Sequence, residues 1–230
     1  MGIARPLTSP PHKIGGLFFN GRDAYVDCGN DESLDITDEI TIEVWLNPQE
    51  IPLNAAYGFV GHEDYKNWML YCWVDDIYFR YINTTEDTQF PHLPNKLTTG
   101  WQHIVAVWTD SDKTVRVYID GVYEGSDTGT GSIKSTDFTR ILIGAVNPTE
   151  RLFNGLISSV RIYNRALSEE EIQLLYANPD YPLTDGLVLW LPMNEHSGNT
   201  VYDLSGYGNH GTIYNAEWAV RAVEHPLHAV

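Results

Sequence analysis

The sequence has no long hydrophobic run and few basic residues, and each shortage excludes a class of function. No stretch approaches the roughly 20 apolar residues of a transmembrane helix, so no membrane insertion is expected. Residues 1–13 are rich in proline and lack the apolar core of a signal peptide, so no signal peptide is visible. Only 14 Lys and Arg residues accompany 31 Asp and Glu residues, which gives a formal net charge of -17. A negative field of this size repels polyphosphate, so no nucleic-acid partner is expected.

Cysteine and the common catalytic motifs are also scarce. The two cysteines, Cys28 and Cys72, each lie in a strand-like segment, which favours two buried free thiols over a disulfide. The 8 histidines do not show the H-x-H or H-E-x-x-H spacing of a zinc site. The chain has no G-x-S-x-G, no G-x-x-x-x-G-K phosphate loop and no E-x-D-x-x-E strand of the kind that retaining glycosidases use. The sequence therefore predicts that the protein is not an enzyme.

Aromatic residues and period-two alternation are abundant, with 7 Trp, 14 Tyr and 7 Phe. Most segments alternate between apolar and polar residues and end at turn residues, which is the pattern of short antiparallel strands. We expect strands at residues 17–19, 24–28, 40–47, 68–74, 77–82, 101–109, 114–119, 122–124, 140–146, 156–163, 187–191 and 212–214. This pattern predicts an all-β sandwich of two antiparallel sheets.

One short helix is expected after residue 168. Ser168 and Glu171 have the spacing of a capping box, and Ile172, Leu175 and Tyr176 form one apolar stripe. The Asn-Pro pair at residues 178 and 179 ends the helix. We expect this helix to pack on the sandwich as a lid.

Several phrases, in their order along the chain, resemble the signatures of a known family. They are LFFNGRDAYVD at 17–27, IEVWL at 42–46, WQHIVAV at 101–107, VYIDG at 117–121, and FNGLI through RIYNRALS at 153–168. This set is similar to laminin G-like domains of the concanavalin A-like lectin/glucanase type. The resemblance implies a single two-sheet jelly-roll domain over residues 14–220, with an N-terminal extension at 1–13 and a C-terminal tail at 221–230.

One part of the resemblance stands at an unexpected place. Residues 186–220 contain GLVLWLPMN and YDLSGYGNHG, which resemble the opening strand and loop of the family although they come last here. Either the domain is circularly permuted, so that 186–220 supplies the family's N-terminal strands, or a second, incomplete copy begins there. Because the family pairs its first and last strands, we expect residues 187–191 to lie beside residues 156–163.

The same resemblance implies a calcium ion at the rim of the sandwich. Calcium takes six to eight oxygen ligands, which glycine-rich loops can supply from side chains and exposed carbonyls. Asn and Asp beside Gly also serve in ordinary turns. The residues that match the family's ligand positions are Asn20, Asp23, Asp203 and Asn209.

A sugar site would need aromatic faces with polar groups beside them. Because Trp68, Leu70 and Cys72 alternate with their neighbours, Met69, Tyr71 and Trp73 must face the other side of the strand. Core packing is the alternative explanation for each of these aromatics. The candidate carbohydrate-binding residues are Tyr71, Trp73, Tyr78, Arg80 and Trp45.

Two classes of function follow from these observations. The first is a noncatalytic glycan-binding or adhesion module, calcium-stabilised, with a glycan or cell-surface polysaccharide as its partner. The second is a structural protein that self-assembles or binds a capsid protein, such as a virion decoration, fibre or surface-filament subunit. The expected location is extracellular, on a cell surface or on a virion.

Overall fold

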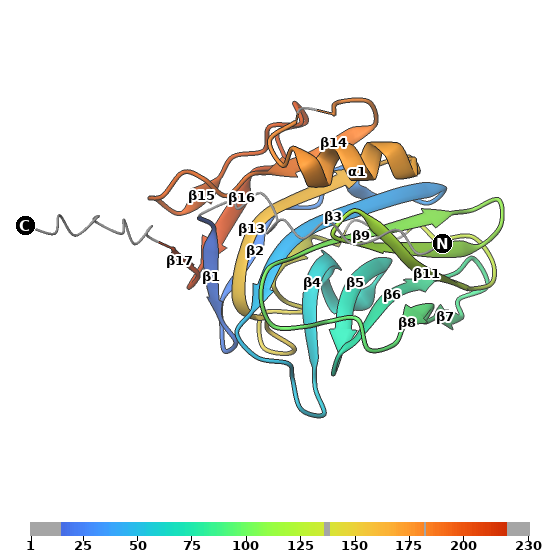
Figure 1. Ribbon diagram of the computed structural model, residues 1–230, viewed down its shortest axis with the longest axis horizontal. Helices are drawn as coiled ribbons and strands as arrows, with labels where there is room; N and C mark the ends of the chain where they lie inside the picture. The colour runs from blue at the N-terminus through green and yellow to red at the C-terminus, as the bar shows by residue number, and fades with distance from the viewer. Residues whose placement is uncertain (1–14, 136–138, 182, 220–230) are drawn as a thin grey trace, which may run out of the picture.

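The computed structural model describes residues 15–135, 139–181 and 183–219, and it consists of two antiparallel β-sheets with one helix on the outside (Figure 1). This confirms the predicted two-sheet sandwich with one short helix. The predicted N-terminal extension at 1–13 and C-terminal tail at 221–230 lie outside the described residues.

One sheet has eight strands in the order β11-β10-β9-β3-β13-β1-β17, and β14 pairs with β13 as well. The strands are β1 (Leu17–Asn20), β3 (Glu39–Pro48), β9 (Gln102–Thr109), β10 (Thr114–Ile119), β11 (Val122–Thr128), β13 (Asn154–Tyr163), β14 (Leu187–Leu191) and β17 (Glu217–Trp218).

The other sheet has nine strands in the order β15-β16-β2-β12-β4-β5-β6-β7, and β8 also pairs with β6. The strands are β2 (Tyr25–Asp27), β4 (Ala56–His62), β5 (Trp68–Trp73), β6 (Asp76–Ile82), β7 (Thr88–Gln89), β8 (His92–Leu93), β12 (Ile141–Ile143), β15 (Thr200–Val201) and β16 (Gly211–Tyr214). Two short 3-10 helices, η1 (Glu32–Leu34) and η2 (Glu63–Tyr65), lie in the connections.

The core lies between the sheets and is filled by alternate residues of each strand. In β5, Trp68, Leu70 and Cys72 join this core, whereas Met69 and Tyr71 belong to a separate cluster on the other side. Cys28 and Cys72 are buried free thiols, as predicted. Each strand of the sandwich therefore has one face for the core and one face that is available for other contacts.

The sequence patterns missed β4, which carries glycine at two of its seven positions. A Cβ atom at Gly58 would lie 2.4 Å from the carbonyl carbon of Ala145, and one at Gly61 would lie 2.5 Å from the Cα atom of Met69. Neighbouring backbone thus requires glycine at both positions, and the glycines conceal the alternation of the strand.

Strand β14 pairs with β13 in the same chain, from Val160 opposite Leu191 to Tyr163 opposite Leu187. Strand β1 pairs with the earlier half of the same edge of β13, from Ile157 to Asn154. The predicted pairing of residues 187–191 with 156–163 is therefore confirmed. The origin of this arrangement in a circular permutation stays a prediction.

Helix α1 (Glu169–Ala177) begins with the predicted capping box, in which Ser168 and Glu171 each accept a hydrogen bond from the other's backbone N–H. Ile172 and Leu175 are buried in a cluster with Val105 and Tyr163 of the eight-stranded sheet. The helix therefore covers the outer face of that sheet, as Figure 1 shows. Among the described residues, no helix is both long and apolar enough to span a membrane.

Candidate functional site

The outer face of the nine-stranded sheet carries a row of stacked rings. Tyr78 on β6 lies between Tyr71 on β5 and His92 on β8, because these three residues are cross-strand partners. The ring centroids of Tyr71 and Tyr78 are 5.1 Å apart, and those of Tyr78 and His92 are 4.7 Å apart. Both faces of the Tyr78 ring are therefore covered by neighbouring rings. A ligand can contact only the edge of this ring, its rim, and its hydroxyl group.

Tyr71 is a support for this row. It is only 6% exposed and packs with Met69, Ala56 and Val146. Burial, together with the neighbouring tyrosines, raises the pKa of its hydroxyl group. The predicted role of Tyr71 as an open stacking face for sugar is corrected, because one face meets Tyr78 and its ring also packs against Tyr65 at 5.5 Å.

Two arginines surround the Tyr65 ring at one side of this row. The Cζ atom of Arg80 is 4.6 Å from the ring centroid, and that of Arg151 is 5.1 Å from it. Arg80 also donates to the Tyr65 carbonyl, and Arg151 donates to the Tyr65 hydroxyl. The outer face thus combines tyrosine rims with guanidinium donors, which can bind hydroxyl or anionic groups.

Two aromatic side chains on the same part of the molecule are open to solvent. Trp73, at the end of β5, is 43% exposed, and Phe90, between β7 and β8, is 51% exposed. Trp73 follows Tyr71 by two residues and therefore lies on the same face of the strand. Of the predicted sugar-binding residues, Trp73 has the most accessible ring.

Trp45 lies on the other sheet, away from the remaining predicted sugar residues, and this part of the prediction was wrong. It is 2% exposed. Its indole packs against the His103 ring at 4.7 Å and stacks on the Tyr176 ring of helix α1 at 5.7 Å, and the His103 and Tyr176 rings are also 5.7 Å apart. The helix covers the face on which Trp45 stands, so the indole packs in the protein interior.

A buried ionic cluster under helix α1 was not found from the sequence. Arg161 donates to both carboxylate oxygens of Glu43, at 3.0 and 2.9 Å, and His103 Nε2 is 3.0 Å from Glu43 Oε1. Burial alone would raise the pKa of Glu43, but the charge of Arg161 and the hydrogen bond to His103 outweigh it and lower the pKa to about 2. Glu43, His103 and Arg161 are completely buried, so a ligand cannot reach them. The cluster therefore contributes to the stability of the fold.

The four predicted calcium ligands do not come together at one site. Asn20 is opposite Asn154 at one end of β13, whereas Asp203 binds the backbone of Trp190, which is opposite Arg161. At about 3.3 Å per residue, this register separates the two places by roughly 20 Å. A single calcium site made from Asn20, Asp23, Asp203 and Asn209 is therefore wrong.

Each of the two pairs of predicted ligands is engaged within its own loop. Asn20 donates to Asp23 Oδ1 at 2.8 Å in the turn between β1 and β2. Asp203 Oδ1 accepts from the backbone of Trp190 and Ser205, and Oδ2 accepts from the Ser205 hydroxyl and the Asn209 backbone. Four donors thus satisfy the Asp203 carboxylate and fix the loop. Among the described residues, no group of three or more His, Cys, Asp or Glu side chains could hold a metal ion.

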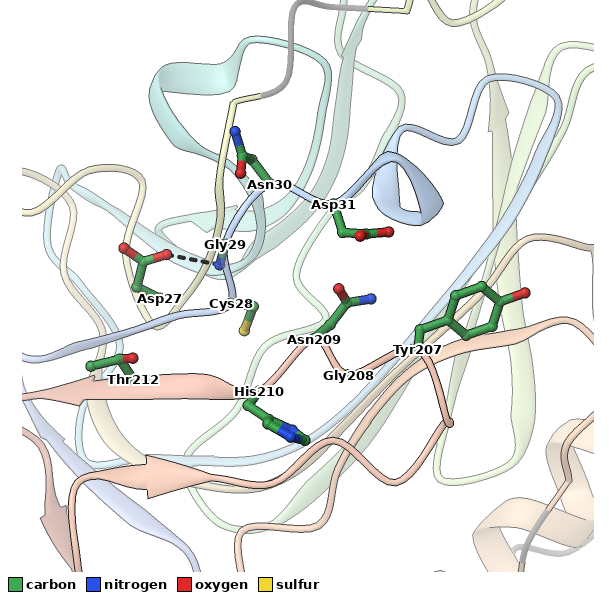
Figure 2. A pocket seen from close by; sticks show the side chains of 10 residues that line it. All are labelled: Asp27, Cys28, Gly29, Asn30, Asp31, Tyr207, Gly208, Asn209, His210 and Thr212. Atoms are coloured by element: carbon green, nitrogen blue, oxygen red, sulfur yellow. Dashed lines mark hydrogen bonds between the residues drawn. The ribbon is translucent and has the colours of Figure 1, made fainter.

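A polar pocket of about 470 Å³ lies beside this loop. Figure 2 shows residues 27–31 on one side of it and residues 207–212 on the other. Asp27 accepts from Gly29 N–H and from Arg140, and Asp31 accepts from Ser33 N–H. The hydrogen bonds from Ser33 lower the pKa of Asp31. Both carboxylates are thus used within the fold.

Comparison with known proteins agrees with this architecture. A family model described as the concanavalin A-like lectin/glucanases superfamily matches residues 20–173. The chain belongs to this superfamily. A curated relative from Rattus norvegicus, the sushi, von Willebrand factor type A, EGF and pentraxin domain-containing protein 1, is 26% identical over 173 residues. The match covers 66% of this chain but only 4% of that relative, so the chain spans a small part of its length.

Solved structures show the same fold. A putative carbohydrate binding protein from Bacteroides ovatus has a TM-score of 0.70 at 18% identity, over 92% of this chain and 61% of the other. A CBM40 of a Ruminococcus gnavus sialidase, bound to sialyllactose, has a TM-score of 0.53 at 13% identity, over 68% and 96%. Domain 4 of a Geobacillus stearothermophilus arabinanase, in complex with arabinotriose, has a TM-score of 0.53 at 21% identity, over 72% and 78%.

Within this lectin/glucanase-like domain, sequence reasoning missed half of the candidate site. Tyr65 ends the 3-10 helix η2, His92 begins the two-residue strand β8, and Phe90 and Arg151 lie in loops, so none of the four stands in a segment long enough to show alternation. The backbone of Tyr65 and of Arg151 is left-handed, with φ of 59° and 57°. Such conformations are uncommon for residues other than glycine, and no sequence pattern marks them. Only the fold brings these residues to the β5–β6 hairpin.

Proposed function

We propose that this chain is a noncatalytic glycan-binding module whose ligand lies across the outer face of the nine-stranded sheet. The observation that carries the proposal is the exposed Trp73 ring on the same strand face as a row of tyrosine rims with arginine donors beside it. We call this surface the aromatic-arginine face; it consists of Tyr65, Tyr71, Trp73, Tyr78, Arg80, Phe90, His92 and Arg151.

The chemistry of sugars fits this arrangement. A pyranose ring has apolar C–H faces and polar hydroxyl edges, so it binds where an aromatic face and hydrogen-bonding groups are adjacent. Trp73 supplies the open aromatic face, and the hydroxyl of Tyr78 and the guanidinium of Arg151 supply polar groups. The fold neighbours that bind sialyllactose and arabinotriose support the same class of ligand. The partner that follows is an extracellular or cell-surface polysaccharide.

The test is retention of the protein by polysaccharides in affinity electrophoresis, with Trp73→Ala as the variant. We expect this substitution to weaken binding at least tenfold, which corresponds to about 1.4 kcal/mol. Tyr123→Ala is the matched control, because Tyr123 is 45% exposed but lies on β11 of the other sheet. Equal binding by wild type and Trp73→Ala would overturn the proposal for this face.

The alternative function is assembly into a fibre or onto a capsid. Sedimentation velocity of the purified chain, measured without polysaccharide, distinguishes assembly from glycan binding. A binding module is expected to give a single species whose size does not change with protein concentration. A concentration-dependent series of larger species, together with no retention by any polysaccharide, would favour assembly.

The predicted calcium ion remains a prediction. Its four proposed ligands do not form one site, so a calcium ion would have to use other oxygens, such as exposed loop carbonyls.

A further inference from the structure

Most of the Lys and Arg side chains in the described part of this acidic chain are paired with carboxylates. Arginine–carboxylate pairs at 3.0 Å or less are formed by Arg116, Arg140, Arg161 and Arg165. Lysine–carboxylate pairs are formed by Lys96, Lys113 and Lys134. Such pairing is expected where 31 acidic residues accompany 14 basic ones.

Arg80 and Arg151 differ from these residues. Within the described residues, neither has a carboxylate partner, and both guanidinium groups lie against the one ring of Tyr65. Burial lowers the pKa of Arg80, and the nearby charge of Arg151 lowers it further. A partly buried and an exposed like charge are therefore held at the same ring, without a carboxylate among the described residues to balance them. This arrangement favours binding of an anion from outside.

The donors of these two side chains are not used up. A guanidinium group carries five N–H bonds. Arg80 donates to the Tyr65 carbonyl and, at 3.5 Å, to the Thr88 hydroxyl, and within the described ranges the Arg151 side chain donates only to the Tyr65 hydroxyl. Arg151 is exposed, so a ligand can reach its side chain. An oxyanion with two or three oxygens suits this pair of planar donors.

We propose that Arg80 and Arg151 bind the carboxylate or sulfate group of an acidic glycan, whose remaining sugars extend along the aromatic-arginine face toward Trp73. The inference rests on the proposed glycan-binding function and names the class of glycan. Arg80 and Asp76 are four residues apart on β6, and Asp76 is opposite Trp73. The anion site and the indole are therefore roughly 13 Å apart along the strands, so the ligand is an oligosaccharide rather than a single sugar.

The experiment compares acidic and neutral forms of the same polymer. Polygalacturonate, alginate and polysialate supply carboxylates, heparin supplies sulfates, and carboxyl-reduced polygalacturonate and desulfated heparin are the matched polymers with less charge. We expect at least one acidic polymer to be retained, and its reduced or desulfated form to bind at least tenfold more weakly. The net charge of -17 repels polyanions in general, so retention of an acidic polymer cannot come from the overall field.

Three variants assign the effect to residues. Arg151→Gln removes the exposed guanidinium, and we expect it to weaken binding of the acidic polymer at least tenfold while binding of the reduced polymer changes less than twofold. Arg80→Lys keeps the charge of the more buried partner and tests its planar donors, with circular dichroism to check that the variant folds. Arg116→Gln is the control, because Arg116 is a half-buried arginine on β10 of the other sheet.

The outcomes separate this inference from the function on which it rests. If a neutral polymer binds as well as its acidic form, or if Arg151→Gln leaves acidic binding unchanged, the inference is overturned and the glycan-binding function stands. If no acidic or neutral polymer is retained, both are overturned. Retention of heparin alone identifies the anion as sulfate, and retention of the uronate or sialate polymers identifies it as carboxylate.

Discussion

Tyr71 and Trp73 stand two positions apart on the same side of β5, but their surroundings give them different roles. Tyr71 is covered by Tyr65, Tyr78 and Met69, whereas nearly half of the Trp73 side chain faces solvent. Period two places both side chains away from the core. It cannot show that residues 65 and 78 cover one of them, because that depends on strand register and loop path.

We expect Tyr71→Ala to lower the free energy of unfolding by about 3 kcal/mol, as large-to-small changes at buried aromatics do. Trp73→Ala should change it by less than about 1 kcal/mol, because an exposed ring contributes little to the core. Urea unfolding followed by circular dichroism measures both. Equal losses for the two variants would show that the rings are equally covered and that Trp73 is not an open face.

Glu43 gives a second prediction at the scale of single residues. Its pKa is about 2 in the folded protein against an ordinary value of 4.5, so the Glu43 carboxylate binds a proton less readily in the folded state than in the unfolded state. The contribution of Glu43 is therefore complete above pH 4.5 and is lost as the pH falls from about 4.5 to about 2. Glu43→Gln leaves Arg161 buried without its counterion, which should cost about 3 to 5 kcal/mol at neutral pH.

The measurement is urea unfolding of wild type and Glu43→Gln between pH 2.5 and pH 7. The difference between the two should shrink as the pH falls through this window. Glu150→Gln is the control, because Glu150 is an exposed loop residue. A difference that stays constant down to pH 2.5 would contradict the assigned role of the carboxylate charge.

At the scale of elements, helix α1 determines which outer face is open. It covers the eight-stranded sheet over β9 and β13, and its Tyr176 stacks on Trp45 of β3. The sequence predicted both the helix and the alternation of β3, but Trp45 and Tyr176 are far apart in the chain. Nothing in the local pattern states which strand a helix covers, so Trp45 was placed in the wrong site while the helix itself was predicted correctly.

The ionic cluster under the helix was missed for the same reason. Glu43, His103 and Arg161 come from β3, β9 and β13, which are neighbours in the sheet. The available signal was that each is a charged or titratable residue within an otherwise apolar strand. That these three residues form one cluster follows only from the strand register, which places Glu43 opposite Arg161 on β13 and opposite Val105 on β9.

The loop of residues 202–210 provides a test of the calcium prediction. Asp203→Ala removes the acceptor of four hydrogen bonds and should lower the free energy of unfolding by about 2 to 4 kcal/mol, since several buried donors lose their partner. If Asp203 acts only through these bonds, the loss is the same in chelator and in millimolar calcium. A loss that appears only in calcium would instead make Asp203 a metal ligand.

Strand β14 is expected to be indispensable for the sandwich. It buries Leu187, Val188, Leu189 and Leu191, and burial of each such side chain contributes about 1.5 to 3 kcal/mol. Truncation after Asn178 also removes the carbonyls of Pro179 and Tyr181, which accept from Arg161. The stabilisation lost with these four side chains is therefore comparable to the whole free energy of unfolding of a typical domain, about 5 to 15 kcal/mol.

The fragment 1–178 should therefore be insoluble or should lack cooperative unfolding, whereas a chain that ends at Ala219 should fold. Thermal melts and solubility after expression provide the measurement. A soluble fragment 1–178 with a sharp melt would show that the C-terminal strands are an addition to a complete sandwich.

At the scale of the whole molecule, the two sheets, their alternation and the superfamily could be predicted from the sequence. The phrases that carry the resemblance lie in strands and tight turns, where local residues determine the conformation. The candidate site could be predicted only in part, because Trp73, Tyr78 and Arg80 share one hairpin, while Tyr65, His92 and Arg151 reach it through loops. Long-range placement of loops is the information that a local pattern lacks.

Glycan is expected to bind at the outer face of the nine-stranded sheet and not at the pocket between residues 27–31 and 207–212. The most direct measurement is a titration of ¹⁵N-labelled protein with a retained polysaccharide fragment, followed through the indole N–H signals of the 7 tryptophans. We predict that the Trp73 signal moves with the β5 and β6 amides, while the buried Trp45, Trp68 and Trp108 stay in place. Shifts confined to Gly29, Asn209 and their neighbours, with Trp73 unmoved, would contradict the account.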